Sequence, residues 1–310
     1  MNVVNAGGMV ICRPEPIVWE GRRGTVVTLD FMSDLHIGAN HVDYNKIKSD
    51  IVRAVKAQAR LNILGDVLDL ILVQDKKRFR PDVLHPKLQG RSNIVNEAVT
   101  WAADILEPAV DLIDVIMVGN HEVSVEKYNN FDPTQALIYE LEKRSKTGHK
   151  IIYGGYTGFI DYRVRKKGKE KSSSGGFRYV IYYHHGSGAY APVTKGLIDF
   201  NRKDTFIDAD LIWLGHKHNK LTVAVEKLSC PMQGWAPNVK DVRHLMTGAY
   251  FNTYAGQTQE SIRQHGRRSN YAADLGLAPQ GKGGARIELV IGASGGNTNG
   301  ENLTEVRVIQ

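Results

Sequence analysis

The first half of the chain alternates short apolar runs with longer amphipathic segments. Runs of apolar and β-branched residues at 25–32, 61–64 and 115–118 predict buried strands. Between them, residues 43–60 and 93–106 carry apolar side chains at a helical period and polar side chains at the other positions. The order strand, helix, strand, helix, strand indicates a parallel sheet with right-handed crossover connections.

The remainder of the chain predicts two helices, at 133–145 and 195–206, and many strands. These strands are expected at 151–165, 177–183, 210–214, 221–225, 242–253, 286–291 and 306–309. Because the late strands follow one another without a helical pattern, we expect a second sheet packed on the first, within one domain spanning 1–310. Residues 219–310 would then complete the second sheet. Residues 1–13 are expected to be either frayed or at an edge.

Polar residues with ligand chemistry follow five of the apolar strands directly. They are Asp34, His36, Asp66, Asn120, His121, His185, His216 and His218. In open α/β sheets the carboxyl ends of the strands are where ligands bind. Asp34 and His36 are two residues apart, as are His216 and His218, so each pair faces one way on an extended segment. This repetition predicts one composite site.

The donor set of this site favours a transition metal. Two carboxylates, one amide and five imidazoles suit Mn²⁺, Fe²⁺, Zn²⁺ or Ni²⁺ better than Mg²⁺ or Ca²⁺. So many ligands exceed the need of one ion and fit two ions about 3.5–4 Å apart that share a bridging carboxylate and water. One choice stays open, because His184 competes with His185 as the ligand. Asp69 is interpreted as a helix-capping acid and not as a ligand.

Composition and charge limit the setting and the partners. At 42% hydrophobic and 24% charged residues, the 310-residue chain resembles a soluble globular protein, and it contains no apolar run long enough to span a bilayer. Its two isolated cysteines, Cys12 and Cys230, suit a reducing cytoplasm. A net charge of +7 and the basic segments at 76–80 and 166–171 are compatible with DNA or RNA as a partner. A nonspecific basic surface is the alternative that charge alone favours.

Five short motifs carry a resemblance to a known family. They are Ser-Asp-Leu-His at 33–36, Gly-Asp-Val-Leu-Asp at 65–69, Gly-Asn-His-Glu at 119–122, His-Gly at 185–186 and Gly-His-Lys-His at 215–218. In this order they resemble the signatures of the calcineurin-like metallophosphoesterase superfamily, over residues 26–218. The resemblance implies a four-layer αββα sandwich, in which two mixed β-sheets are flanked by helices and a dinuclear metal centre lies between the sheets.

The resemblance also implies roles for individual residues. Asp34, His36, Asp66 and His218 would hold one metal ion. Asp66, Asn120, His185 and His216 would hold the other, with Asp66 bridging. His121 would stay off the metals and act as a general acid or as a donor to a phosphate oxygen. A bridging hydroxide, with Mn²⁺ as the first choice of metal, would then attack phosphorus in a phosphate ester.

Departures from the superfamily pattern narrow the substrate class. Leu70 and Val118 stand where the protein Ser/Thr phosphatases of the superfamily place arginines, so a protein phosphatase is disfavoured. The first motif is more similar to the phosphodiesterase and nuclease branches, and residues 185–188, 270–272 and 277–279 loosely resemble phage and prophage phosphoesterases. We therefore expect a phosphodiesterase, with nucleic acid as one candidate substrate. The alternatives are a small-molecule or nucleotide phosphomonoesterase and a non-catalytic, metal-stabilised nucleic-acid-binding protein.

Overall fold

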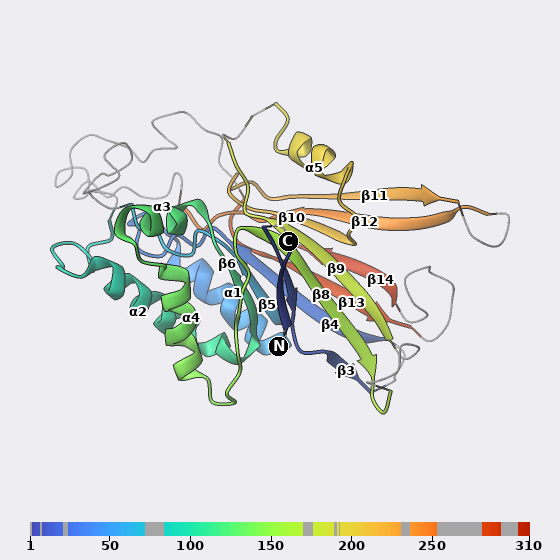
Figure 1. Ribbon diagram of the computed structural model, residues 1–310, viewed down its shortest axis with the longest axis horizontal. Coiled ribbons are helices and arrows are strands. Elements are labelled where there is room, and N and C mark those ends of the chain that lie inside the picture. Colours follow the sequence, from blue (N-terminus) through green and yellow to red (C-terminus); the bar gives the residue numbers. More distant parts are fainter. Residues whose placement is uncertain are drawn as a thin grey trace.

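Two mixed β-sheets pack face to face, and helices cover the outer face of each (Figure 1). This computed structural model describes residues 2–6, 8–20, 24–71, 84–169, 176–188, 191, 193–230, 236–252, 281–292 and 303–310. The predicted four-layer αββα sandwich is confirmed. Among the described residues, no helix combines the length and the apolar character that a bilayer crossing requires.

The parallel core of the six-stranded sheet forms as the sequence predicts. Strands β4 (Thr25–Ser33), β5 (Arg60–Leu64) and β6 (Ile113–Met117) run parallel and are joined through helices α1 (Tyr44–Ala57) and α2 (Ile94–Leu106). Asp43 begins α1 by accepting a hydrogen bond from the Lys46 backbone at 3.0 Å. The helix ends three residues earlier than predicted, because Gln58 adopts a left-handed φ of 49° and the chain turns into β5.

Further helices lie on the same side of this sheet. The short η1 (Glu107–Leu112) follows α2, and α4 (Pro133–Arg144) occupies the predicted position. Helix α3 (Asn120–Asn129) was not predicted. Only Glu122 and Val125 of its residues are buried, so the segment lacks the apolar period that identifies a helix in a sequence. Two of the candidate site residues therefore begin a helix and are not part of an irregular loop.

The eight-stranded sheet has the strand order β1-β2-β8-β9-β10-β12-β11, with β3 paired to β8. Its strands are β1 (Asn2–Ala6), β2 (Met9–Arg13), β3 (Ile17–Trp19), β8 (Thr157–Lys166), β9 (Gly176–His184), β10 (Leu211–Leu214), β11 (Leu221–Ser229) and β12 (Asn238–Met246). The first residues form the predicted edge. Helix α5 (Leu197–Asp204) covers the outer face.

The sequence led us to expect that the last strands all belong to this second sheet, but they do not. Strands β13 (Ala285–Ile291) and β14 (Leu303–Ile309) join the six-stranded sheet, with β13 antiparallel to β4. The short β7 (Ile152–Tyr153), expected to continue into β8, also pairs in this sheet, beside β6. The alternating buried side chains of β13 face the space between the sheets, and the free edge of β4 offers the backbone partners.

Three separate cores hold the four layers together. The first lies between α1, α2, α4 and the six-stranded sheet, the second between the two sheets, and the third between α5 and the eight-stranded sheet. Phe31 and Trp213 meet edge to face across the middle core, with ring centroids 4.8 Å apart. The middle core fixes the two sheets relative to each other, so the ends of strands from different sheets come together.

Candidate metal centre

The eight predicted site residues gather where five strands end. Asp34 and His36 follow β4, Asp66 follows β5, and Asn120 and His121 follow β6. The remaining three come from the second sheet, after β9 and β10, which run parallel to each other. Sequence-distant strand ends therefore meet at one edge of the sandwich, as the carboxyl ends of parallel strands do in α/β folds.

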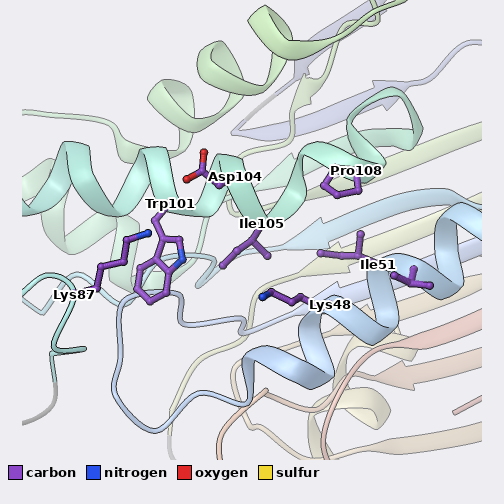
Figure 2. A pocket seen from close by; sticks show the side chains of 8 residues that line it. Lys48, Ile51, Lys87, Trp101, Asp104, Ile105 and Pro108 are labelled. Atoms are coloured by element: carbon purple, nitrogen blue, oxygen red, sulfur yellow. The ribbon is translucent and has the colours of Figure 1, made fainter.

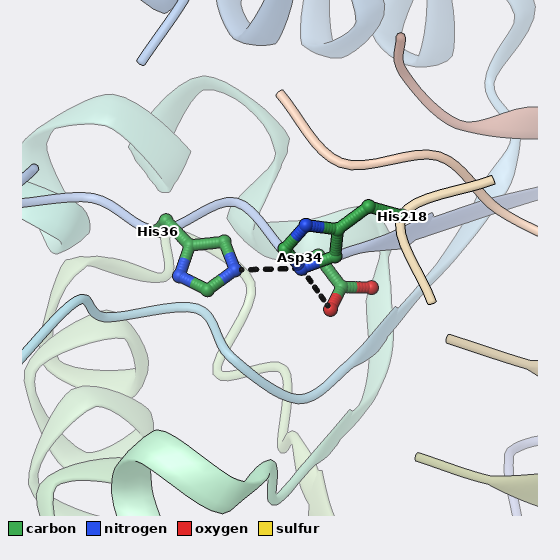
Figure 3. Close-up of side chains that lie close together, drawn as sticks. All are labelled: Asp34, His36 and His218. Atoms are coloured by element: carbon green, nitrogen blue, oxygen red, sulfur yellow. Dashed lines mark hydrogen bonds and ion pairs between the residues drawn. The ribbon is translucent and has the colours of Figure 1, made fainter. Parts of the chain in front are cut away.

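The first half of the centre consists of Asp34, His36 and His218 (Figure 3). The Nε2 atoms of the two imidazoles lie 3.2 Å apart, and Nε2 of His218 lies 3.4 Å from Oδ1 of Asp34. One potential ligand atom from each residue lies within 4.8 Å of the others. Two imidazole nitrogens and a carboxylate oxygen that converge on one point match the donor chemistry of a divalent transition metal.

The second half consists of Asp66, His185 and His216, whose ligand atoms also lie within 4.8 Å of one another. Nε2 of His185 lies 3.2 Å from Oδ2 of Asp66 and 3.1 Å from the side-chain oxygen of Asn120. His185 is fully buried. Burial opposes the charged imidazole, but the carboxylate of Asp66 outweighs it and raises the pKa of His185 to about 9. The surroundings of this residue therefore favour a positive charge.

A third group of ligand atoms joins the two halves. His36, Asp66 and His121 bring theirs within 4.8 Å of one another, and two of these residues also belong to the other groups. The His36 and His121 rings are in edge contact, with centroids 4.8 Å apart. Asp66 therefore lies at the middle of the whole cluster, and the residues fit two adjacent cations.

Asp69 has a different place from the one that the sequence suggested. We interpreted it as a helix-capping acid, but Oδ1 of its buried carboxylate lies 2.8 Å from Nδ1 of His121 and 3.4 Å from Nδ1 of His36. Burial opposes the carboxylate charge, yet the two imidazoles lower the pKa of Asp69 below its ordinary range. In turn, Asp66 and Asp69 overcome the burial of His121 and raise its pKa to about 9.

Glu122 ends the Gly-Asn-His-Glu motif, and the sequence indicated no role for it. The structure shows that it binds backbone N–H groups. Its buried carboxylate accepts hydrogen bonds from the backbone N–H groups of Asp66 at 2.9 Å, Leu68 at 3.0 Å and Gly119 at 2.9 Å. The side chain therefore ties the loop after β5 to the start of α3. A glutamate three residues after a helix-capping position is a recognisable signal of such a link.

The backbone at the centre is unusual. Five of the site residues have a positive φ: Asp34 at 53°, His36 at 50°, Asp66 at 45°, His216 at 67° and His218 at 56°. Such values are uncommon outside glycine and cluster at functional sites, where the surrounding structure maintains the strain. Gly119 permits one of the closest approaches, because a Cβ atom there would lie 2.1 Å from Oδ1 of Asp66.

The two adjacent histidines lie in different surroundings. His185 lies in the cluster, whereas Nδ1 of His184 accepts a hydrogen bond from the Gly186 backbone at 2.8 Å. Burial, helped by the nearby charge of Lys203, lowers the pKa of His184 to about 4. His184 is thus a neutral residue that shapes the turn beside the centre.

A separate groove of about 440 Å³ lies between α1 and α2 (Figure 2). It is lined by Lys48, Ile51, Val52, Lys87, Trp101, Asp104, Ile105 and Pro108. The predicted site residues all lie within the described part of the chain, and none of them lines this groove. It is a feature of the helical layer and not of the candidate centre.

Several segments considered in the sequence fall outside the described residues. They are the basic residues 76–80, residues 170–171 of the basic tip, and the segments 270–272 and 277–279 with their loose phage likeness.

Comparison with known proteins adds little to this geometry. No protein-family model matches the chain, and no curated protein matches it. Among solved structures, 27 chains match. One is a metallophosphoesterase from Sphaerobacter thermophilus, which is 13% identical and is aligned over 73% of this chain and 78% of its own, with a TM-score of 0.28. At this level of similarity the functional assignment depends on the site residues themselves.

Proposed function

We propose that the chain is a metal-dependent phosphoester hydrolase with a dinuclear centre. The observation that carries the proposal is the convergence of three overlapping groups of ligand atoms, each within 4.8 Å, at the ends of five strands. The four-layer fold and the five ordered motifs support membership of the calcineurin-like metallophosphoesterase superfamily. A purely structural role would require these buried acids and imidazoles to converge without a ligand, which is energetically costly.

We assign the ligands by the group in which each residue lies. Asp34, His36 and His218 would hold one ion, Asn120, His185 and His216 the other, and Asp66 would bridge them. Mn²⁺ is our first choice, and Zn²⁺, Fe²⁺ and Ni²⁺ also suit the mixture of oxygen and nitrogen donors. When bound, two such ions supply the Lewis acidity that activates water and neutralises the charge of a phosphate group.

We assign the transfer of a proton to the leaving group to His121. Its Nδ1 faces Asp69, and its Nε2 lies 4.0 Å from Oδ2 of Asp66, on the side of the cluster. Because both carboxylates favour the protonated imidazole, Nε2 can donate its proton to the leaving oxygen of the ester. Asp69 holds the ring in the orientation that this step needs.

The protein would act in the cytoplasm. Phosphodiesters, including DNA or RNA, are the substrate class that we favour. Three observations support this preference. They are the motif comparison, the presence of Leu70 and Val118 where protein phosphatases place arginines, and the net charge of +7. A phosphomonoesterase acting on nucleotides or other small molecules is the second candidate.

The first experiment compares hydrolysis of bis-p-nitrophenyl phosphate and p-nitrophenyl phosphate in added Mn²⁺. We expect the diester to be cleaved, and Asp66→Asn to abolish cleavage because it removes the shared carboxylate. Asp208→Asn is the matched control, since the Asp208 side chain is 90% exposed and forms an ion pair with Lys240. Preference for the monoester would select the second candidate. Absence of cleavage of both esters with every divalent metal, in protein of confirmed metal content, would refute the enzyme proposal and favour a metal-stabilised binding protein.

A further inference from the structure

A sixth strand end reaches the centre, and the sequence did not reveal it. Strand β12 was predicted to run to residue 253, but it ends at Met246, and the described residues 247–252 turn across the site as an irregular segment. Thr247 anchors the start of this segment. Its hydroxyl lies 2.6 Å from that of Ser33, at the end of β4, and accepts a hydrogen bond from Nε1 of Trp213 at 3.0 Å.

The remainder of the segment is fixed to the first half of the centre. The backbone N–H of Tyr250 donates to the carbonyl oxygen of Asp34 at 3.3 Å, and its hydroxyl donates to Asp50 at 2.9 Å. Two residues further on, the Asn252 backbone donates to the His41 carbonyl at 2.7 Å. The backbone of Phe251 is therefore anchored on both sides by its neighbours.

The Phe251 ring contacts both imidazoles of the first half. It stacks on His36, with centroids 4.4 Å apart and an interplanar angle of 29°, and lies 5.5 Å from the His218 ring. His36 is thereby held in two ways, by Asp69 at Nδ1 and by Phe251 across its face. His218 depends more on this contact, because its side chain is 33% exposed and its backbone φ is 56°.

The second half of the centre has different support. His185 is fully buried, and its Nδ1 lies 3.3 Å from the carbonyl oxygen of Leu64. Tyr156 meets its ring edge to face at 5.4 Å, and the Tyr156 hydroxyl donates to the Gly186 carbonyl at 2.6 Å. The His216 backbone links the halves by donating to the Asp34 carboxylate at 3.1 Å, but the ring contact from the segment after β12 is made to His36 and His218, whereas Tyr156 packs against His185.

We propose that Phe251 is a positioning residue for the first metal site alone, holding His36 and His218 in the geometry that binds the ion. This inference rests on the proposed dinuclear centre. Removal of a residue that orients a metal ligand without binding the metal lowers the metal affinity by roughly 10- to 100-fold. Loss of the ring should therefore lower the affinity for one of the two ions by this factor and leave the affinity for the other unchanged.

The test is calorimetric titration of the metal-free protein with Mn²⁺, which does not depend on turnover. Wild type is expected to bind two ions. Phe251→Leu keeps an apolar side chain but removes the ring face, so one of the two affinities should fall, whereas Phe251→Tyr keeps the ring and should restore it. Phe206→Leu is the matched control, because Phe206 is a 68% exposed phenylalanine just beyond α5.

The outcomes separate the inference from the function on which it rests. Unchanged binding of both ions by Phe251→Leu, or equal weakening of both, would overturn the positioning role while leaving the dinuclear centre intact. Absence of Mn²⁺ binding by wild type would instead refute the proposed centre. Circular dichroism checks that each variant is folded, and Phe251→Met replaces the leucine variant if that one does not fold.

Discussion

Oδ1 of Asp69 lies 2.8 Å from Nδ1 of His121, so a buried carboxylate supports the only imidazole of the cluster to which we assign no metal. The contact places Nδ1 against Asp69, while Nε2 lies 4.0 Å from Oδ2 of Asp66, on the side of the site. It also adds to the field of Asp66 that raises the pKa of His121 to about 9. Orientation and protonation of the proposed acid therefore depend on one residue outside the ligand set.

Replacing this carboxylate should reduce turnover more than binding. Asp69→Asn retains the shape of the side chain but removes its charge, so we expect kcat to fall by roughly 10²-fold or more, the range over which general acids contribute. The pKa of His121 should also fall, and because the acid works in its protonated form, the alkaline limb of the kcat profile should move to lower pH. Steady-state kinetics on the diester from pH 6 to 10 measures both effects. An unchanged kcat and profile would contradict the role of Asp69.

The glycine before the Asn-His pair should tolerate no side chain. In Gly119→Ala the new Cβ would lie 2.1 Å from Oδ1 and 2.2 Å from the backbone nitrogen of Asp66. We expect a loss of stability of about 1–3 kcal/mol from overpacking, together with loss of metal binding. Gly168→Ala is the comparison, since Gly168 has a φ of 78° but no atom within 4 Å of its Cβ position. Urea unfolding and Mn²⁺ titration distinguish backbone strain from displacement of Asp66.

Removal of metal should lower the melting temperature. Ions that bind only the folded state stabilise it by about 2.7 kcal/mol at a hundredfold excess over the dissociation constant. We expect the melting temperature to fall on chelation and to recover when Mn²⁺ is added back, whereas Asp34→Asn should show a smaller recovery. Scanning calorimetry with and without a chelator measures the shift. A melting temperature that does not respond to chelation in wild type would count against bound metal.

A cluster away from the centre predicts a pH-dependent stability. Asp161 is 2% exposed and lies within 3.4 Å of the guanidinium groups of Arg13, Arg163 and Arg178. Burial opposes its charge, but the arginines lower its pKa, so its contribution to stability is present above the unfolded-state pKa and is lost as the pH falls through the lower folded-state value. Because the arginines are partly exposed, Asp161→Asn should destabilise by about 1–3 kcal/mol at pH 7.

Urea denaturation of wild type and Asp161→Asn at pH 7 and pH 3 checks this expectation. The difference between the two proteins should shrink at the lower pH, because the wild-type carboxyl group is then becoming protonated. A difference that is the same at both values would show that charge is not the cause.

The sequence predicted the parts of the fold whose signals are local. The strands before Asp34, Asp66 and Asn120 are mostly apolar and β-branched, and glycines at 65 and 119 mark sharp turns, so the ligands could be located without coordinates. Helix α3 escaped because only Glu122 and Val125 of its residues are buried, so it shows no apolar period. Asp69 was misplaced because its partners are imidazoles distant in the sequence, a contact that no local pattern encodes.

Long-range pairing explains the other differences. Strand β13 was recognised as a strand, but an alternating pattern specifies a buried face and not a partner, so its place beside β4 could not be derived. Phe251 lay inside a predicted strand, and its contact with His36 joins residues 215 positions apart in a chain of 310. Predictions based on periodicity therefore located the ligands but not all of the residues that support them.

The position of β13 has a consequence for how the protein is made. Strand β4 leads directly into the first two ligands and is synthesised long before β13, yet its outer edge is covered only when residues 285–291 have been synthesised. Until then β4 presents unpaired backbone groups of the kind that recruit other nascent chains into aggregates. Premature termination before this point should therefore yield insoluble fragments, even though every ligand of the centre has already been translated.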